Sequence, residues 1–213
     1  QMKGIDIIDS YRRLPLGKYM EIMAIYKDEG MEDIDKQVKM VSILTDMAED
    51  DILNLPIPDY KELVAKSRFL ESPSTEDHTR IAKTYIVGNY TVIPTTDMRK
   101  VTTAQYIDFQ SFHAAGMDEH LAEIMSCLLI PKGKKYNTDY DIVDLQKAIR
   151  EDLSVSDMLS LYAFFLMSSA KSIKDMSTFC KEEIRKIKDK EKREELMNRM
   201  KEAEENFSRN GVG

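Results

Sequence analysis

The chain has 213 residues, of which 42% are hydrophobic and 32% are charged, and its net charge is −7. Apolar residues recur with regular spacing almost throughout, which excludes a disordered protein, and the length suits one large domain or two small ones. The negative charge argues against a protein that acts mainly on duplex nucleic acid, because phosphate neutralisation supplies most of that affinity.

Four helices are predicted in the first third of the chain. Pro15 suits the first turn of a helix that Gly30 ends. Asp33 is a good N-cap for a second helix, residues 48–55 form a short one, and Pro58 opens the fourth. The side chains expected on the inner faces are Tyr19, Ile22, Met23 and Tyr26, then Val38, Val41 and Leu44 with Ile34, Ile43 and Met47 beside them, then Tyr60, Leu63, Val64 and Phe69.

A β-hairpin is predicted in the middle of the chain. Apolar and β-branched residues flank Gly88 and Asn89, a dipeptide typical of a tight turn, and Pro94 closes the segment. An isolated hairpin is marginally stable in water. We therefore expect the hairpin to pack on helices or to pair with another strand, for which residues 5–8 are one candidate.

Helices resume after the hairpin. Thr102 and Gln105 have the spacing of a capping box, in which each residue satisfies a backbone N–H of the other, and Gly116 breaks the helix that they begin. The next helix is expected over residues 118–130. Its inward residues are Leu121, Ile124, Met125 and Leu128.

The rest of the second half is also predicted to be helical. Residues 131–141 form a loop and residues 141–152 a short amphipathic helix. Ser154 and Asp157 have capping-box spacing at the start of an apolar helix that runs through Ala170. This apolar stretch is far too short to span a bilayer, so we expect a buried helix and no membrane association.

A long charged helix is predicted over residues 173–207. Its apolar stripe runs as far as Ile187 and lapses over the eight consecutive charged residues 188–195. The stripe then resumes at Met197, Met200 and Phe207. A small apolar face without a core of its own usually seeks a groove or a partner helix. These three residues are therefore the predicted protein-binding residues.

The predicted fold is mainly α, with a helical globular domain over residues 1–187 and a protruding charged helix and tail over residues 188–213. Two stretches, residues 10–72 and 98–170, are candidate repeat units bridged by the hairpin, because their helix starts align when Tyr19 is placed on Tyr106. The alternative is that two unrelated amphipathic helices look alike. A true repeat predicts that both tyrosines are half-buried in equivalent places.

No catalytic constellation is visible. His113, His120 and Cys127 recur every seven residues, but that spacing separates neighbours by about 10 Å along a helix, too far for one metal ion. Cys127 and His120 lack a third orienting group for nucleophilic catalysis. The acid-rich residues 49–51 and 137–141 lack calcium-loop spacing. We expect no enzyme activity, no cofactor and no metal.

The cysteines and the N-terminus bear on location. Cys127 and Cys180 form no disulfide framework, which indicates a reducing or indifferent compartment. The N-terminus lacks the basic and apolar segments of a signal peptide. Lys132, Lys134 and Lys135 lie in one loop and leave open a local nucleic-acid contact, although a solvated loop is the more ordinary explanation.

Several stretches resemble a group of small tailed-phage morphogenesis proteins, including tail-assembly-chaperone-like proteins of Bacteroidetes phages. The stretches are LPLGKYMEI (14–22), SILTDMAEDDILNLPIPDYKEL (42–63), VTTAQYIDF (101–109) and LSVSDMLSLYAFFL (153–166). The resemblance implies a non-enzymatic virion assembly or structural protein without cofactors. It implies phage structural proteins as partners, such as tail or connector components, and a place in the bacterial cytoplasm or in the virion. A homo-oligomer and a regulatory or nucleic-acid-associated phage factor remain alternatives.

Overall fold

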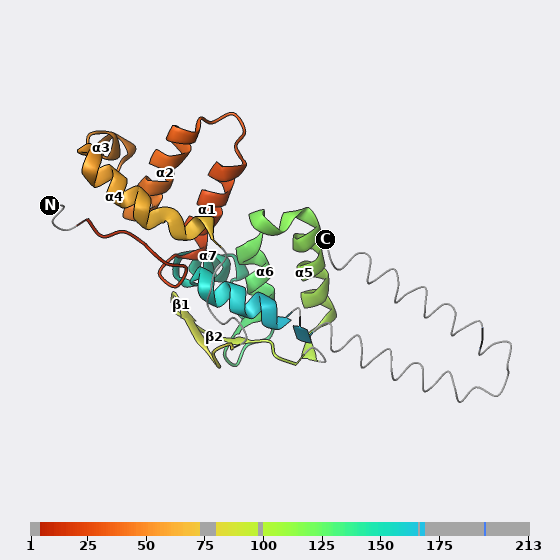
Figure 1. Ribbon diagram of the computed structural model, residues 1–213. Helices are drawn as coiled ribbons and strands as arrows, with labels where there is room; N and C mark the ends of the chain where they lie inside the picture. The colour runs from red at the N-terminus through yellow and green to blue at the C-terminus, as the bar shows by residue number, and fades with distance from the viewer. Residues whose placement is uncertain (1–4, 73–79, 98–99, 166, 169–193, 195–213) are drawn as a thin grey trace. The chain divides into compact units, whose positions relative to one another are not determined.

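The computed structural model describes residues 5–72, 80–97, 100–165, 167–168 and 194. Nearly all of them belong to one compact unit of the chain, residues 1–165. This unit is mainly helical and carries a small three-stranded antiparallel sheet, which confirms the predicted fold class (Figure 1). The boundary at residue 187 and, apart from Glu194, the charged helix after it lie outside the described residues.

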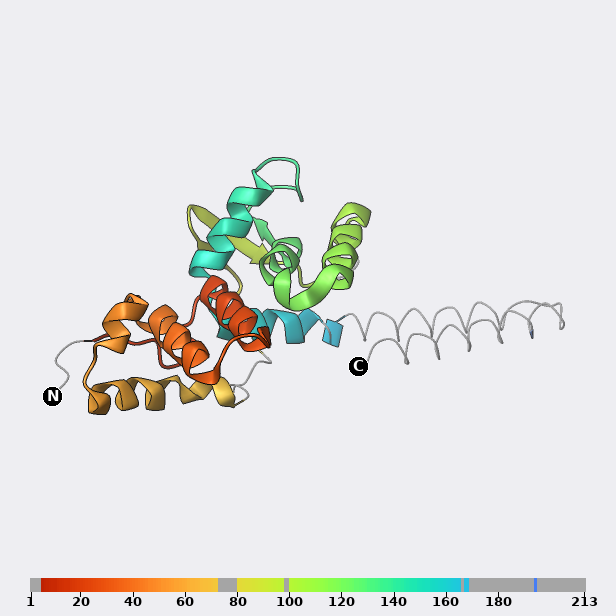
Figure 2. The same cartoon turned by 90° about the horizontal axis from the view of Figure 1, so that it is seen from above.

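The first helices begin close to where the sequence predicts them. Their bounds are α1 (Leu16–Lys27), α2 (Asp33–Thr45), α3 (Glu49–Leu53) and α4 (Ile57–Ser67), followed by a 3-10 turn, η1 (Arg68–Glu71). Helix α2 lies between α1 and α4 (Figure 2). The predicted inner residues Val38, Val41 and Leu44 are buried. Tyr26, expected on the inner face of α1, is 40% exposed, and Ile34, expected beside the inner face of α2, is 54% exposed.

The sheet confirms the hairpin and corrects its partner. Strands β1 (Tyr85–Val87) and β2 (Tyr90–Pro94) pair across Gly88, whose φ of 52° favours glycine. The third strand is β3 (Leu129–Pro131), in the order β1-β2-β3. Residues 5–8 are not the partner, since the backbone N–H of Ile8 donates instead to the oxygen of Leu44, at 3.0 Å.

The helix expected over residues 118–130 is shorter than predicted. A 3-10 turn, η3 (Met117–Glu119), precedes α6 (Leu121–Leu128), and the chain then extends into β3. Pro131 explains the change, because a residue before proline is pushed out of the helical region and Ile130 is therefore extended. The predicted inward residues of α6 are all buried: Leu121, Ile124, Met125 and Leu128.

The other helix starts follow their capping signals. Both hydrogen bonds of the predicted capping box between Thr102 and Gln105 are present at the start of α5 (Thr103–Gly116). The Asp141 carboxylate caps α7 (Ile142–Asp152). The Ser154 hydroxyl oxygen accepts a hydrogen bond from the backbone N–H of Asp157, and residues 155–165 are helical.

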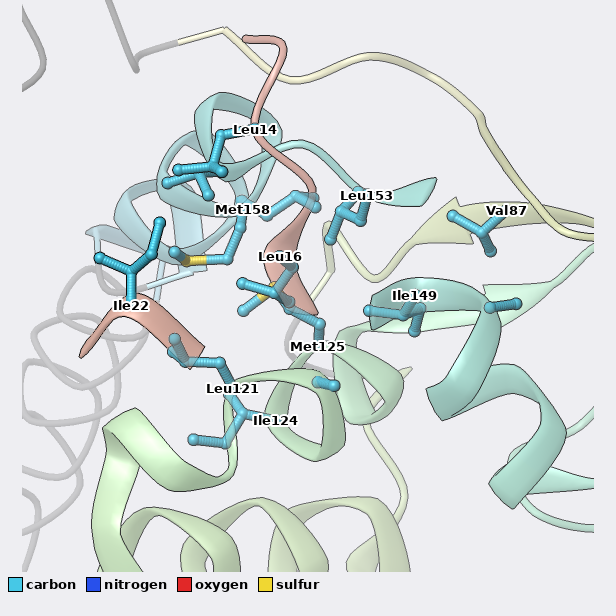
Figure 3. Packing of buried hydrophobic residues seen from close by; sticks show 14 of the residues in the cluster. Leu14, Leu16, Ile22, Val87, Leu121, Ile124, Met125, Ile149, Leu153 and Met158 are labelled. Carbon is cyan, nitrogen blue, oxygen red and sulfur yellow. The ribbon is translucent and has the colours of Figure 1, made fainter. Parts of the chain in front are cut away.

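The two ends of the unit meet in one hydrophobic core. The backbone N–H of Leu16 donates to the oxygen of Leu153 at 2.8 Å, and the N–H of Val155 donates to the oxygen of Leu14 at 2.9 Å. Figure 3 shows the apolar side chains gathered at this crossing. They include Leu14, Leu16, Ile22, Val87, Leu121, Ile124, Met125, Ile149, Leu153 and Met158. The position of the segment before α1 is therefore set by hydrogen bonds to residues almost 140 positions later in the sequence.

The two tyrosines that align in the candidate repeat occupy different surroundings. Tyr19 is partly buried against the core, on a helix that packs on α2, α6 and α7. Tyr106 is 54% exposed, on a helix that packs mainly on α6. The expectation of equivalent half-buried places is therefore wrong. The repeat over residues 10–72 and 98–170 stays a prediction without this support.

Candidate protein-interaction surfaces

The buried thiol is part of a structural network. Cys127 is fully buried, and its sulfur lies 3.4 Å from the hydroxyl of Tyr136, which donates to the Asp108 carboxylate at 2.8 Å. Burial raises the pKa of the Cys127 thiol to about 11. A thiol that stays protonated at neutral pH is a poor nucleophile. The network instead joins α5, α6 and the loop before α7.

The two histidines in the described ranges lie against aromatic rings rather than around a common point. His113 stacks on Phe109, and His120 lies beside Phe112. In the described ranges, no three His, Cys, Asp or Glu side chains are placed to hold a metal ion. No helix in the same ranges is long and apolar enough to cross a membrane.

Helix α5 has an exposed side without charge. Of its residues, only Gln105 and Phe109 are buried, and they fix the helix to the unit: Gln105 donates to the backbone oxygen of Cys127, and the Phe109 ring lies 4.6 Å from that of Phe165. Asp108 is partly buried, and its carboxylate accepts a hydrogen bond from the Tyr136 hydroxyl. The exposed residues, which we call the α5 face, are Thr103, Ala104, Tyr106, Ile107, Gln110, Ser111, His113, Ala114 and Ala115.

The α5 face differs from the exposed sides of the other helices. In α4, the exposed positions include Lys61, Glu62 and Lys66. In the α5 face there is no Lys, Arg, Asp or Glu, although Tyr106 and Ile107 are each more than half exposed. An absence of charged residues together with exposed aromatic and aliphatic side chains is typical of the central part of protein interfaces.

A second candidate surface is concave and is formed by other residues of the unit. Helix α1, the turn η3 and the C-terminal end of α7 enclose an open groove of about 770 Å³, which we call the α1–α7 groove. It is lined by Pro15, Gly17, Lys18, Met20, Glu21, Met23, Ala24, Lys27, Asp28, Asp118, Glu119, Arg150 and Glu151. None of these residues belongs to the α5 face.

Sequence reasoning missed both surfaces. It expected Tyr106 to be half-buried, although the lack of charged residues at outward positions of residues 103–116 was a readable signal. The α1–α7 groove has no such signal, because it depends on contact between helices far apart in sequence. The predicted protein-binding residues Met197, Met200 and Phe207 lie outside the described residues, so that prediction stays as it was.

The basic loop is exposed as expected. Lys132, Lys134 and Lys135 all face solvent, and the loop is anchored where the backbone N–H of Lys132 donates to the oxygen of Thr91, at 2.8 Å.

Comparison of the chain with protein-family models, with curated proteins and with solved structures gives no match.

Proposed function

We propose that this chain is a non-enzymatic assembly or structural protein of a tailed phage, tail-assembly-chaperone-like, that binds other phage proteins. The resemblance of four stretches to tailed-phage morphogenesis proteins supplies the phage context. The α5 face is the observation that carries the binding role. Gln105 and Phe109 attach α5 to the rest of the unit, and Tyr106 and Ile107 are exposed to solvent.

The chemistry of the α5 face suits a protein partner. An exposed side chain such as Ile107 gains from burial at about 25 cal/mol per Å² of apolar surface. The small residues Ala104, Ser111 and Ala114 recur at helical spacing around it and permit close approach of a second backbone. Without charges to desolvate, such a face loses little when water is removed.

The proposal is tested by one substitution made at two matched places. Ala114 and Ala65 are both exposed, and each is the third residue from the end of its helix. The chain and its Ala114→Glu and Ala65→Glu variants are expressed together with the structural proteins encoded beside it in the phage genome. Captured proteins are identified by mass spectrometry, and melting temperatures are compared.

We expect the unaltered chain and Ala65→Glu to retain a tail or connector protein, whereas Ala114→Glu loses it without a change in melting temperature. Ile107→Glu should act in the same way. Equal retention by Ala114→Glu and Ala65→Glu would remove the α5 face from the interaction. Failure of the unaltered chain to bind any of these proteins would overturn the assembly role.

A nucleic-acid-associated phage factor is the second candidate, and the exposed lysines at 132, 134 and 135 favour it. Its test is a mobility shift with duplex DNA that weakens steeply as salt is raised. The assembly role places the protein in the cytoplasm of the bacterial host, or in the finished virion when it remains as a component. Mass spectrometry of purified particles distinguishes these two places, and size measurement tests homo-oligomerisation.

A further inference from the structure

The α1–α7 groove has an apolar strip. Met20, Met23 and Ala24 lie at positions i, i+3 and i+4 of α1 and so share one side of that helix. Both methionines are partly exposed and Ala24 is exposed. Methionine is flexible and polarisable, which lets it fit side chains of varied shape. The strip is therefore suited to the apolar side of a partner.

The cations of the groove are already neutralised within the chain. Each has a carboxylate within ion-pair distance. The pairs are Lys18 with Asp46 at 2.7 Å, Lys27 with Asp118 at 2.8 Å and Arg150 with Glu123 at 2.6 Å. These pairs fix the rim of the groove and leave no unpaired positive charge on it.

Several acids of the groove have no such partner. Among the described residues, no lysine or arginine lies within ion-pair distance of Glu21, Asp28 or Glu119, and all three are exposed. The Asp28 carboxylate accepts a hydrogen bond from the backbone N–H of Gly30, at 2.9 Å. The groove therefore joins an apolar strip to exposed acids that form no ion pair, Glu21 and Asp28 at α1 and Glu119 in η3, although Glu119 still attracts the Lys27 ammonium and raises its pKa.

We propose that the α1–α7 groove binds a lysine- or arginine-rich amphipathic helix of a partner protein. The apolar side of that helix packs on Met20 and Met23, and its cations pair with Glu21 and Glu119. Helix α1 has 12 residues, so at 1.5 Å per residue it offers a length of about 18 Å, which matches a docked helix of about three turns. Charge complementarity selects a basic helix over an acidic one.

The probe is a synthetic peptide of about 18 leucines and lysines patterned as an amphipathic helix, labelled with fluorescein. Its control is a peptide of the same composition in scrambled order, without an apolar side. Binding to the full chain is followed by fluorescence anisotropy at low and at high salt. Charged contacts at an exposed groove predict weaker binding at high salt.

Two variants separate the charge from the apolar strip. Glu21→Lys combined with Glu119→Lys should weaken binding about tenfold or more, because two attractive contacts become repulsive. Met20→Ser combined with Met23→Ser should weaken it about fivefold through loss of apolar burial. The matched control is Asp51→Lys combined with Asp139→Lys, which changes net charge equally at exposed acids outside the groove.

The proposal predicts that the control variant binds within about twofold of the unaltered chain and that the scrambled peptide binds at least tenfold more weakly. Melting temperatures of all variants are compared to confirm that they fold. Equal weakening in Asp51→Lys with Asp139→Lys would show attraction by net charge alone and overturn the proposal. Equal binding of both peptides would overturn it too. The α5 face is a separate surface, so these results do not depend on the test of the proposed function.

Discussion

The side-chain amide of Gln105 donates a hydrogen bond to the backbone oxygen of Cys127, at 2.5 Å, and so joins the first turn of α5 to the last turn of α6. Carbonyl groups in the last turn of a helix have no partner within that helix. Gln105 also accepts from the backbone N–H of Thr102 and is only 5% exposed. One buried glutamine therefore satisfies groups at the ends of two helices.

Replacing Gln105 should destabilise the fold more than replacing its exposed neighbour. Gln105→Leu leaves the buried oxygen of Cys127 without a donor, which costs about 1–3 kcal/mol. Gln110→Leu, on the α5 face, should change the free energy of unfolding by about 0.5 kcal/mol or less. Urea denaturation of both variants measures the difference. Equal effects would mean that the bond to Cys127 adds nothing to stability.

Cys127 should be an unreactive thiol in the folded protein. In a Cys180→Ser variant it is the one remaining cysteine. Because its pKa is raised to about 11 and it is fully buried, we expect slow reaction with a thiol-specific disulfide reagent at pH 8 and rapid reaction in urea. Fast labelling of the folded protein would contradict this reading. Cys127→Ala combined with Cys180→Ala should keep partner binding and lose about 1–3 kcal/mol of packing energy.

The same thiol should make stability fall at alkaline pH. The folded pKa of Cys127, about 11, lies above the ordinary value of 9.0, so between these values the unfolded chain loses its proton while the folded chain keeps it. Stability therefore falls as pH rises from about 9 to about 11, by at most about 3 kcal/mol from this group. Urea titrations at several pH values should show a steeper fall for the unaltered chain than for Cys127→Ala. Parallel curves would contradict the prediction.

The signals that predicted the fold well were local ones. Thr102 and Gln105 hydrogen-bond to each other over three residues, so the start of α5 can be recognised in the sequence. Pro15 marks the start of α1 to within one residue, but as its extended N-cap residue and not in its first turn as predicted. The turn at Gly88 can also be recognised locally, because its positive φ angle favours glycine. These features needed no knowledge of distant partners.

The features that were mispredicted depend on distant partners. Ile130 continues an apolar helical pattern, but Pro131 and pairing with Ile93 make it a strand. Tyr106 was predicted to be half-buried, but the buried side of α5 is formed by Gln105 and Phe109, and Tyr106 lies on the exposed side. The α1–α7 groove combines residues near position 20 with residues near 119 and 150, and no periodicity in one segment indicates such a meeting.

Gly17 should be required for the close approach of α1 to α7. A Cβ atom at this position would lie 3.0 Å from the backbone oxygen of Arg150, which cannot move aside as a side chain can. Alanine is the better helix former by about 1 kcal/mol, so Gly17→Ala would stabilise α1 if space allowed. We expect instead a loss of about 1–3 kcal/mol from overpacking. Gly30→Ala, which meets only the flexible Asp28 side chain, is the matched control and should change little. A melting temperature for Gly17→Ala at or above that of the unaltered chain would contradict the expected contact.

Ending the chain at Lys188 should separate folding from binding. The buried core residues of the described unit extend no further than Phe165, so removal of residues 189–213 should leave the melting temperature nearly unchanged. The same truncation removes Met197, Met200 and Phe207, for which the sequence predicts contact with a protein partner, and we expect partner binding or self-association to be lost. A full-length variant with serine at these three positions is the matched control, because it keeps the charged residues while removing the apolar ones. Pull-down and size measurement on both proteins test the prediction. Unchanged association would reduce the segment to a tail without a binding role, and a large drop in melting temperature would mean that it contributes to the stability of the fold.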